Sequence, residues 1–209
     1  MTGPTRLDTV EGIFERAARE PLAWQLVARE LVYAANLLYK RYTEARPEEL
    51  LKVKWPPPPI DLNRFHASGR PVLLLYGLAI ENLIKAVLIS EGHSPVQNRR
   101  LNTSFKTHDL TGLFRAGRLS LRSDVEKLLK RLQAAIESGK YPIPTQPAPV
   151  FDDAISRREF DLIHRVLEGL ESALHALSES RVKRLPKTDL RLLGVSPEPI
   201  LAEWDGVDE

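Results

Sequence analysis

A long apolar segment with charged residues in its interior constrains this chain more than any other feature. Residues 73–90 have the sequence LLLYGLAIENLIKAVLIS, and Pro71 just before them suits the first turn of a helix. The apolar residues cover more than half of a helical circumference, which predicts a central helix of a helical core. Glu81 and Lys85 lie four residues apart with the acid first, the order that pairs best. The pair is expected either on an exposed edge or against a partner helix.

Three other segments have helical periodicity. Their apolar residues recur at intervals of three to five positions, and we expect long helices near residues 22–44, 71–90, 121–138 and 153–179. Thr107 is the expected N-cap of a short helix with Asp109 in its first turn, and Ser120 is the expected cap of the third long helix. Asp152 or Asp153 is the expected start of the last one. The predicted fold is all-α, an up-and-down bundle of four to five helices.

Proline-rich segments divide the chain. The run Pro56–Pro59 predicts a stiff connector, and KYPIPTQPAP over residues 140–149 predicts an irregular loop. The composition changes at Arg181, where a basic segment precedes an acidic end that contains Trp204. We therefore predict a helical bundle over residues 1–180 and an extended C-terminal tail over residues 181–209, lying on the body or on a second subunit.

Composition excludes several classes of function. The formal charge of +2 does not by itself indicate nucleic acid, although it permits local basic patches. Cysteine is absent, so neither disulfides nor a thiolate site is expected. The apolar runs are shorter than the roughly 20 residues that cross a bilayer, and no signal sequence is evident, so a cytoplasmic protein without a membrane partner is expected. The histidines show no metal-ligand spacing, and we expect neither metal nor cofactor.

The order of three motifs resembles that of the HEPN superfamily of α-helical domains. These motifs are GLAIENLIKAVLISEGHSP in the central helix, KTHDLTGLF after it, and KYPIP after the third helix, and the resemblance covers roughly residues 22–179. It implies a helical bundle that often dimerises. Some members are metal-independent ribonucleases or toxins of antiviral and toxin–antitoxin systems, whereas others are non-catalytic interaction modules.

Active members of this superfamily carry an arginine, four to six residues, and then a histidine on the last long helix. The segment SRREFDLIH offers Arg157 or Arg158 before His164. A seven-residue step keeps Arg157 on nearly the same helical face as His164, whereas Arg158 lies well off that face. The resemblance therefore implies Arg157 and His164 as catalytic residues and Arg158 as a supporting one. The polar residue that usually follows the family's arginine is replaced here by Arg158.

The implied chemistry is cleavage of RNA without a metal. Histidine takes or gives a proton near neutral pH, arginine holds a phosphate through two hydrogen bonds, and two subunits place their pairs across one cleft. The resemblance also implies supporting roles for Glu81 and Lys85, facing the bundle or the cleft. His108 occupies the family's HDL position, where we expect helix capping or a structural hydrogen bond.

Two classes of function thus stay open. A ribonuclease requires Arg157 and His164 accessible in a basic cleft, whereas a binding module buries His164 or leaves it beside acidic residues such as Glu168. The expected partners are a second copy of the chain, joined through the leucine stripe of the last long helix and the tail, with RNA for the nuclease and an antitoxin or other protein for either class.

Overall fold

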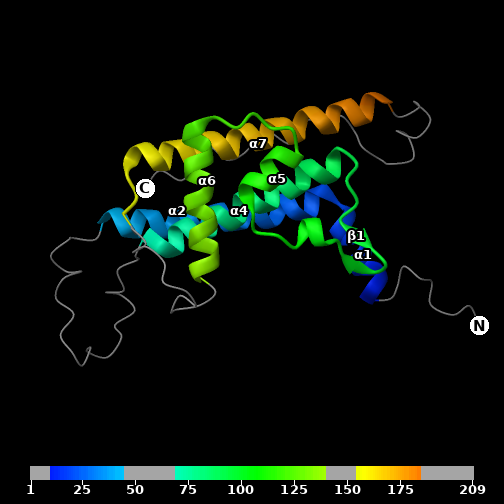
Figure 1. Ribbon diagram of the computed structural model, residues 1–209, viewed down its shortest axis with the longest axis horizontal. Helices are drawn as coiled ribbons and strands as arrows, with labels where there is room; N and C mark the ends of the chain where they lie inside the picture. Colours follow the sequence, from blue (N-terminus) through cyan, green and yellow to red (C-terminus); the bar gives the residue numbers. More distant parts are fainter. Residues whose placement is uncertain (1–9, 45–68, 140–153, 185–209) are drawn as a thin grey trace, which may run out of the picture.

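The computed structural model describes residues 10–44, 69–139 and 154–184, and this part of the chain is mainly helical (Figure 1). The all-α prediction is confirmed for it. The elements are α1 (Val10–Arg19), α2 (Pro21–Glu44), α4 (Gly69–Ser90), β1 (Val96–Gln97), β2 (Arg100–Leu101), the 3₁₀ helix η3 (Thr103–Phe105), α5 (Leu110–Ala116), α6 (Ser123–Gly139) and α7 (Arg157–Arg184). The strands β1 and β2 form a hairpin too short to give an alternating sequence pattern.

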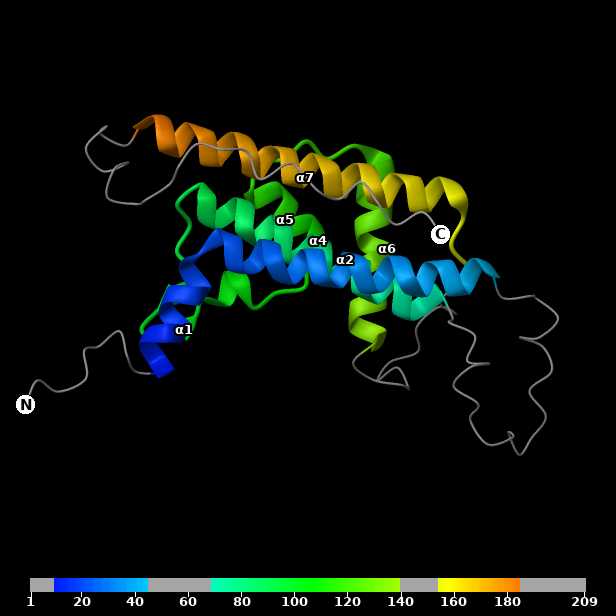
Figure 2. The same ribbon diagram turned by 180° about the vertical axis from the view of Figure 1, so that it is seen from behind.

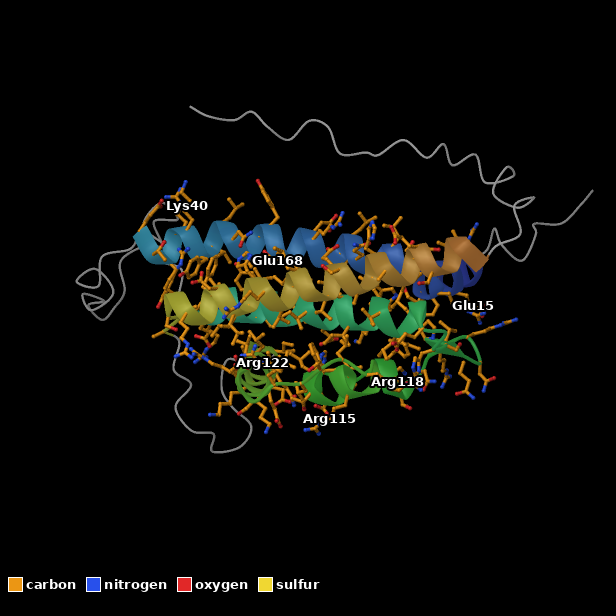
Figure 3. The ribbon with its side chains drawn as sticks, turned by 90° about the horizontal axis from the view of Figure 1, so that it is seen from above. Glu15, Lys40, Arg115, Arg118, Arg122 and Glu168 are labelled. Atoms are coloured by element: carbon orange, nitrogen blue, oxygen red, sulfur yellow. The ribbon has the colours of Figure 1, made fainter. Side chains whose placement is uncertain are left out.

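The helices surround α4, which contacts α2, α5, α6 and α7 (Figures 1 and 2). α2 runs antiparallel to α4, whereas α7 runs in the same direction as α4. α6 crosses the long helices at a steep angle, and Figure 3 shows it nearly end-on. The fold therefore differs from the simple up-and-down bundle that the sequence predicted.

Burial on nearly all sides explains the composition of α4. Most of its side chains are inaccessible to solvent, including Tyr76, Ile80 and Ile84. By length and composition alone α4 could cross a membrane, but 78% of its most apolar 18-residue window is buried inside the bundle. Burial of this apolar surface is the main stabilising contribution to the fold, and α4 has the role that its sequence predicted.

The steep crossing of α6 depends on a glycine in α4. A Cβ atom at Gly77 would lie 3.1 Å from the backbone oxygen of Leu132 and 3.1 Å from the side chain of Ile136, both on α6. A side chain at this position would require Ile136 or the α6 backbone to shift, whereas glycine allows the close approach without a shift. Leu132 and Ile136 are themselves buried against α4. Gly77 thus fixes where α6 crosses the core.

The starts of α5 and α6 differ from the predicted ones. Asp109 is the N-cap of α5: its carboxylate accepts a hydrogen bond from the Gly112 amide at 2.9 Å, which lowers the pKa of Asp109. Thr107 instead accepts a hydrogen bond from the Asp109 amide. α6 begins at Ser123, so Ser120 lies before the helix and does not cap it. Both starts lie a few residues later than a cap-and-period pattern indicates.

The last helix also starts later and ends later than predicted. α7 begins at Arg157, and the Ser156 hydroxyl accepts a hydrogen bond from the Glu159 amide as an N-cap does. Asp152 and Asp153 lie outside the described residues. α7 continues to Arg184, past the predicted domain boundary at residue 180, and the rest of the predicted tail and the Pro56–Pro59 connector also lie outside the described residues.

Replacement of Gly77 by valine should lower the free energy of unfolding by about 1–3 kcal/mol, because the new side chain overlaps the α6 backbone. Gly169→Val is the matched control, since a Cβ atom at Gly169 meets nothing within 4 Å, and its effect should stay within about 0.5 kcal/mol. Urea unfolding followed by circular dichroism measures both variants. Equal losses would contradict a close α4–α6 crossing.

Candidate functional site

Arg157 and His164 lie on one side of α7, with the Phe160 ring between them. The guanidinium carbon of Arg157 is 5.7 Å from the centre of the Phe160 ring, and the centre of that ring is 4.4 Å from the centre of the His164 ring. The seven-residue spacing separates Arg157 and His164 by about 10 Å along the helix axis. The structure therefore brings the two predicted catalytic residues to one face without direct contact between them.

α2 holds this end of α7 through aromatic packing. Tyr39 stacks on Phe160 with ring centres 3.9 Å apart and an angle of 12° between the ring planes. Burial raises the pKa of Tyr39, and the nearby positive charge of Arg157 opposes this rise. The positive charge of Arg157 therefore affects the pKa of Tyr39 on α2.

A hydrogen-bonded chain from the core orients His164. The Tyr76 hydroxyl donates to Asn36 Oδ1 at 2.5 Å, and the Tyr76 hydroxyl oxygen also lies 3.3 Å from His164 Nε2. Because the only hydroxyl proton goes to Asn36, the Tyr76 oxygen accepts from an Nε2–H group of His164. In neutral histidine this tautomer leaves Nδ1 with the free lone pair.

Tyr76 is suited to a fixed role in this chain. Its side chain is inaccessible to solvent, and this burial raises the pKa of Tyr76 far above its ordinary value. The hydroxyl therefore stays protonated and acts as a neutral donor and acceptor. His164 itself is half-buried.

Arg157 reaches into solvent on the outside of α7. Its Nε lies 3.1 Å from Asp161 Oδ1, with 80% of the Arg157 side chain and 50% of the Asp161 side chain exposed. An ion pair this exposed typically contributes only about 0.2–1 kcal/mol, so an anionic ligand can displace the carboxylate. Glu168 is exposed one turn after His164 (Figure 3). The face therefore mixes one exposed arginine with carboxylates.

Arg158 points to a different part of the molecule. It lines a groove between α6 and α7 together with Arg122 and Lys127. In Figure 3, Arg122 lies at the start of α6, on the opposite side of α7 from α2. This placement agrees with the 100° step between consecutive helical residues, which separates Arg158 from the Arg157–His164 face.

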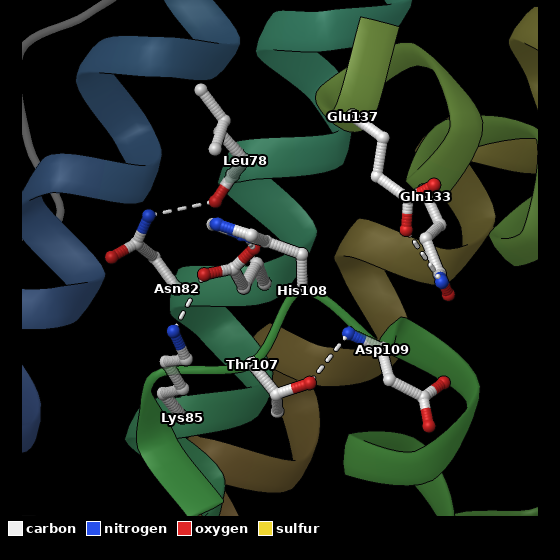
Figure 4. A network of polar contacts seen from close by, with 9 residues as sticks. Leu78, Asn82, Lys85, Thr107, His108, Asp109, Gln133 and Glu137 are labelled. Atoms are coloured by element: carbon white, nitrogen blue, oxygen red, sulfur yellow. Dashed lines mark hydrogen bonds and ion pairs between the residues drawn. The ribbon is translucent and has the colours of Figure 1, made fainter. Parts of the chain in front are cut away.

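Glu81, Lys85 and His108 form a second polar cluster, which is buried (Figure 4). Lys85 Nζ lies 2.5 Å from Glu81 Oε1, and His108 Nδ1 lies 2.8 Å from Glu81 Oε2. Glu81 and Lys85 are each only 5% exposed. The Lys85 ammonium also lies 5.5 Å from the centre of the Trp24 ring, a favourable position for a cation. The structure thus shows the Glu81–Lys85 pair inside the fold and not on an exposed edge.

The buried cluster connects elements and does not support His164 directly. Glu81 follows Tyr76 by five residues on α4, so the two side chains project about 140° apart around the helix. Glu81 instead connects α4 to His108, which lies in the segment before α5. The His108 side chain is 30% exposed. His108 therefore has the structural hydrogen bond that its position predicted.

Exposed apolar side chains form a stripe on α2 beside the candidate site. These residues, which we call the α2 stripe, are each at least half exposed: Leu22, Leu26, Tyr33 and Leu37. Asn36 of the site lies three residues after Tyr33 of the stripe, and residues at this spacing are neighbours on a helix surface. The leucine stripe of α7, from which the sequence suggested a dimer interface, is buried in the core, as Leu167, Leu170 and Leu174 show. Within the described residues, most of the large exposed apolar side chains thus lie on α2, with Ile13 and Phe14 exposed on α1.

Sequence reasoning missed four residues of the site, namely Asn36, Tyr39, Tyr76 and Phe160. The three aromatic residues resemble ordinary core positions in the sequence. A tyrosine in a core helix indicates that its hydroxyl has a buried partner, but only the fold identifies that partner. In residues 10–44, 69–139 and 154–184, no group of three histidine or acidic side chains could hold a metal ion.

In comparisons with known proteins, no family model, no curated protein and no solved structure matches the chain. Its function is therefore inferred from its own residues.

Glu81→Gln should lower the free energy of unfolding by about 3–5 kcal/mol, because it leaves the Lys85 ammonium buried without a carboxylate. The double variant Glu81→Gln/Lys85→Met should lose less than the sum of the single variants, since the two residues interact directly. Urea unfolding of the wild type, Glu81→Gln, Lys85→Met and the double variant gives the coupling energy between the two residues. Glu126→Gln on α6 is the control, because it breaks a solvent-accessible pair of the same spacing with Lys130 and a second one with Arg115, and it should have little effect. Additive losses at Glu81 and Lys85 would contradict a buried pair.

Proposed function

We propose that the protein is a HEPN-like, metal-independent endoribonuclease that uses Arg157 and His164. One observation carries this proposal: a half-buried His164, oriented by the Tyr76 hydroxyl, shares a face of α7 with an exposed Arg157. A histidine anchored at one ring nitrogen presents the other nitrogen for proton transfer. An arginine with a weakly held carboxylate is available for a phosphate.

The reaction follows from these roles. His164 Nδ1 accepts the proton of an RNA 2′-hydroxyl, and the 2′-oxygen forms a bond to the adjacent phosphorus atom. The phosphorus–5′-oxygen bond then breaks, and an acid donates a proton to the leaving oxygen. Arg157 stabilises the negative charge on the phosphate oxygens in the transition state. The products are a 2′,3′-cyclic phosphate and a free 5′-hydroxyl.

A second copy of the chain completes the site in this proposal. On the Arg157–His164 face, the described part of one chain offers His164 as its histidine, whereas the reaction needs both a base and an acid. The α2 stripe lies beside Asn36, so a second copy packed on this stripe brings its own Arg157 and His164 near those of the first. Apolar residues with this exposure are unusual on a monomer surface when they form one patch. We therefore propose that the homodimer forms through α2 and not through the α7 leucines.

A non-catalytic interaction module is the second candidate. It is favoured by the Arg157–Asp161 pair and by Glu168, which place carboxylates on the candidate face. In that case the α2 stripe binds a protein partner, and the His164–Tyr76 contact only stabilises the bundle. On the resemblance to HEPN domains, we propose that either candidate acts in a cytoplasmic toxin–antitoxin or antiviral system, with an antitoxin as one kind of partner.

The purified protein should cleave single-stranded RNA in the presence of EDTA, because no metal takes part. His164→Ala should lower the rate by about 10²–10⁴-fold, the usual contribution of a general acid or base. Arg157→Ala should also lower it strongly, because the phosphate loses its positive partner. Gel analysis of a labelled RNA measures the rates.

Arg165→Ala is the matched control for the loss of one positive charge from α7. Arg165 is exposed next to His164 but projects about 100° away from it, so cleavage should persist. Wild-type levels of cleavage by His164→Ala would assign the activity to another site. Absence of cleavage by the wild type would favour the interaction module.

Leu26→Glu should convert the dimer to a monomer and abolish cleavage, because it places a charge in the α2 stripe. Val27→Glu is the matched control: Val27 is 46% exposed against 50% for Leu26, but it projects about 100° further around α2. Sedimentation equilibrium measures the mass of both variants. A wild type that is monomeric at every concentration, or equal behaviour of the two variants, would remove the proposed interface.

A further inference from the structure

A basic groove lies on the side of α7 opposite the Arg157–His164 face. It has a volume of about 770 Å³ and lies between the first turns of α6 and α7, with Leu128 and Leu162 among its lining residues. Six charged residues line it, four of them basic: Arg122, Lys127, Arg131, Arg158, Asp124 and Glu159. The groove therefore carries an excess of positive charge in a chain whose overall charge is nearly balanced.

The carboxylates of the groove are already engaged. Arg131 Nη1 donates to both carboxylate oxygens of Glu159, at 2.7 Å each. Asp124 Oδ2 lies 3.1 Å from Arg122 Nη2. Arg131 also donates to the carbonyl oxygen of Ala154, so it fixes the start of α7 against α6. The contacts of Arg131 thus join α6 to the start of α7 beside the groove.

Lys127 and Arg158 are basic residues of the groove that form no ion pair within the described part of the chain. Both side chains are exposed, and within residues 10–44, 69–139 and 154–184 neither has an ion-pair partner. Since Lys127 extends from α6 and Arg158 from α7, two positive groups face one groove from opposite walls. Two free cations across a groove suit a chain of phosphates better than a single anion.

We propose that this groove binds the backbone phosphates of the same single-stranded RNA that is cut at the Arg157–His164 face, and this inference rests on the proposed function. Arg157 and Arg158 are consecutive and project about 100° apart, so positive charge continues around the first turn of α7 from one face to the other. A flexible single strand can follow this curved path, whereas a stiff duplex cannot. Lys127 and Arg158 thus act in substrate binding, separate from the chemistry.

Binding of a fluorescein-labelled oligouridine to the His164→Ala protein, followed by fluorescence anisotropy, tests the groove without cleavage. The affinity is measured between about 50 and 200 mM salt, since each phosphate contact on a single strand contributes about 0.7 to the slope of log affinity against log salt. Lys127→Ala/Arg158→Ala should weaken binding and reduce this slope by about 1.4, the value for two contacts.

Arg19→Ala/Lys106→Ala is the matched control, because it removes two exposed positive charges from α1 and from the end of η3. Its salt slope should equal that of the parent protein. Circular dichroism confirms that both double variants are folded. In the active protein, Lys127→Ala/Arg158→Ala should raise KM with little change in kcat, because the groove holds RNA away from the cleaved bond.

The outcomes separate this inference from the proposed activity. RNA binding that depends on the groove, without cleavage by the wild type, would support the groove and remove the ribonuclease. Cleavage by the wild type with an unchanged salt slope in Lys127→Ala/Arg158→Ala would overturn the groove alone. Competition by poly-glutamate as strong as that by unlabelled oligouridine would also overturn it and favour an acidic protein partner. No RNA binding at all would overturn both.

Discussion

The burial of α4 on nearly every side is the constraint on which the rest of the fold depends. A helix in that position must place any charged residue in a low-dielectric interior, where an unpaired charge is strongly unfavourable. Glu81 and Lys85 satisfy this requirement for each other, and His108 and Trp24 complete their surroundings. The cluster thereby links α4 to α2 and to the segment before α5. The charged residues of the central helix have a structural role.

The same helix supplies the contact that orients the candidate site. Tyr76 projects from α4 away from the buried charges and meets Asn36 and His164. A buried hydroxyl retains its proton, so its two partners fix the direction of each hydrogen bond. α4 thus serves two different networks on two of its sides, one that joins elements and one that sets the tautomer of a surface histidine.

α7 presents two different polar surfaces because of its helical geometry. Its inner leucines pack into the core, and its two consecutive arginines begin two different surfaces, one with Phe160 and His164 and the other with the groove of Lys127. The α2 stripe beside the first surface is apolar and exposed. A dimer on α2 and a strand of RNA around the start of α7 do not compete for the same residues. The proposed activity and the proposed RNA groove therefore fit on one chain together.

The sequence by itself determined the helical class, the central position of α4 and the four-residue spacing of Glu81 and Lys85, because these follow from local periodicity. It also placed Arg157 and not Arg158 on the side of His164, since that depends only on residues of one helix. Tertiary structure decided that α6 crosses at Gly77, that the α7 leucines are internal, and that Asn36 and Tyr76 reach His164. The named contacts of Gly77, Asn36 and Tyr76 join residues 40 or more positions apart, and helical periodicity carries no information about which helices meet, or at what angle.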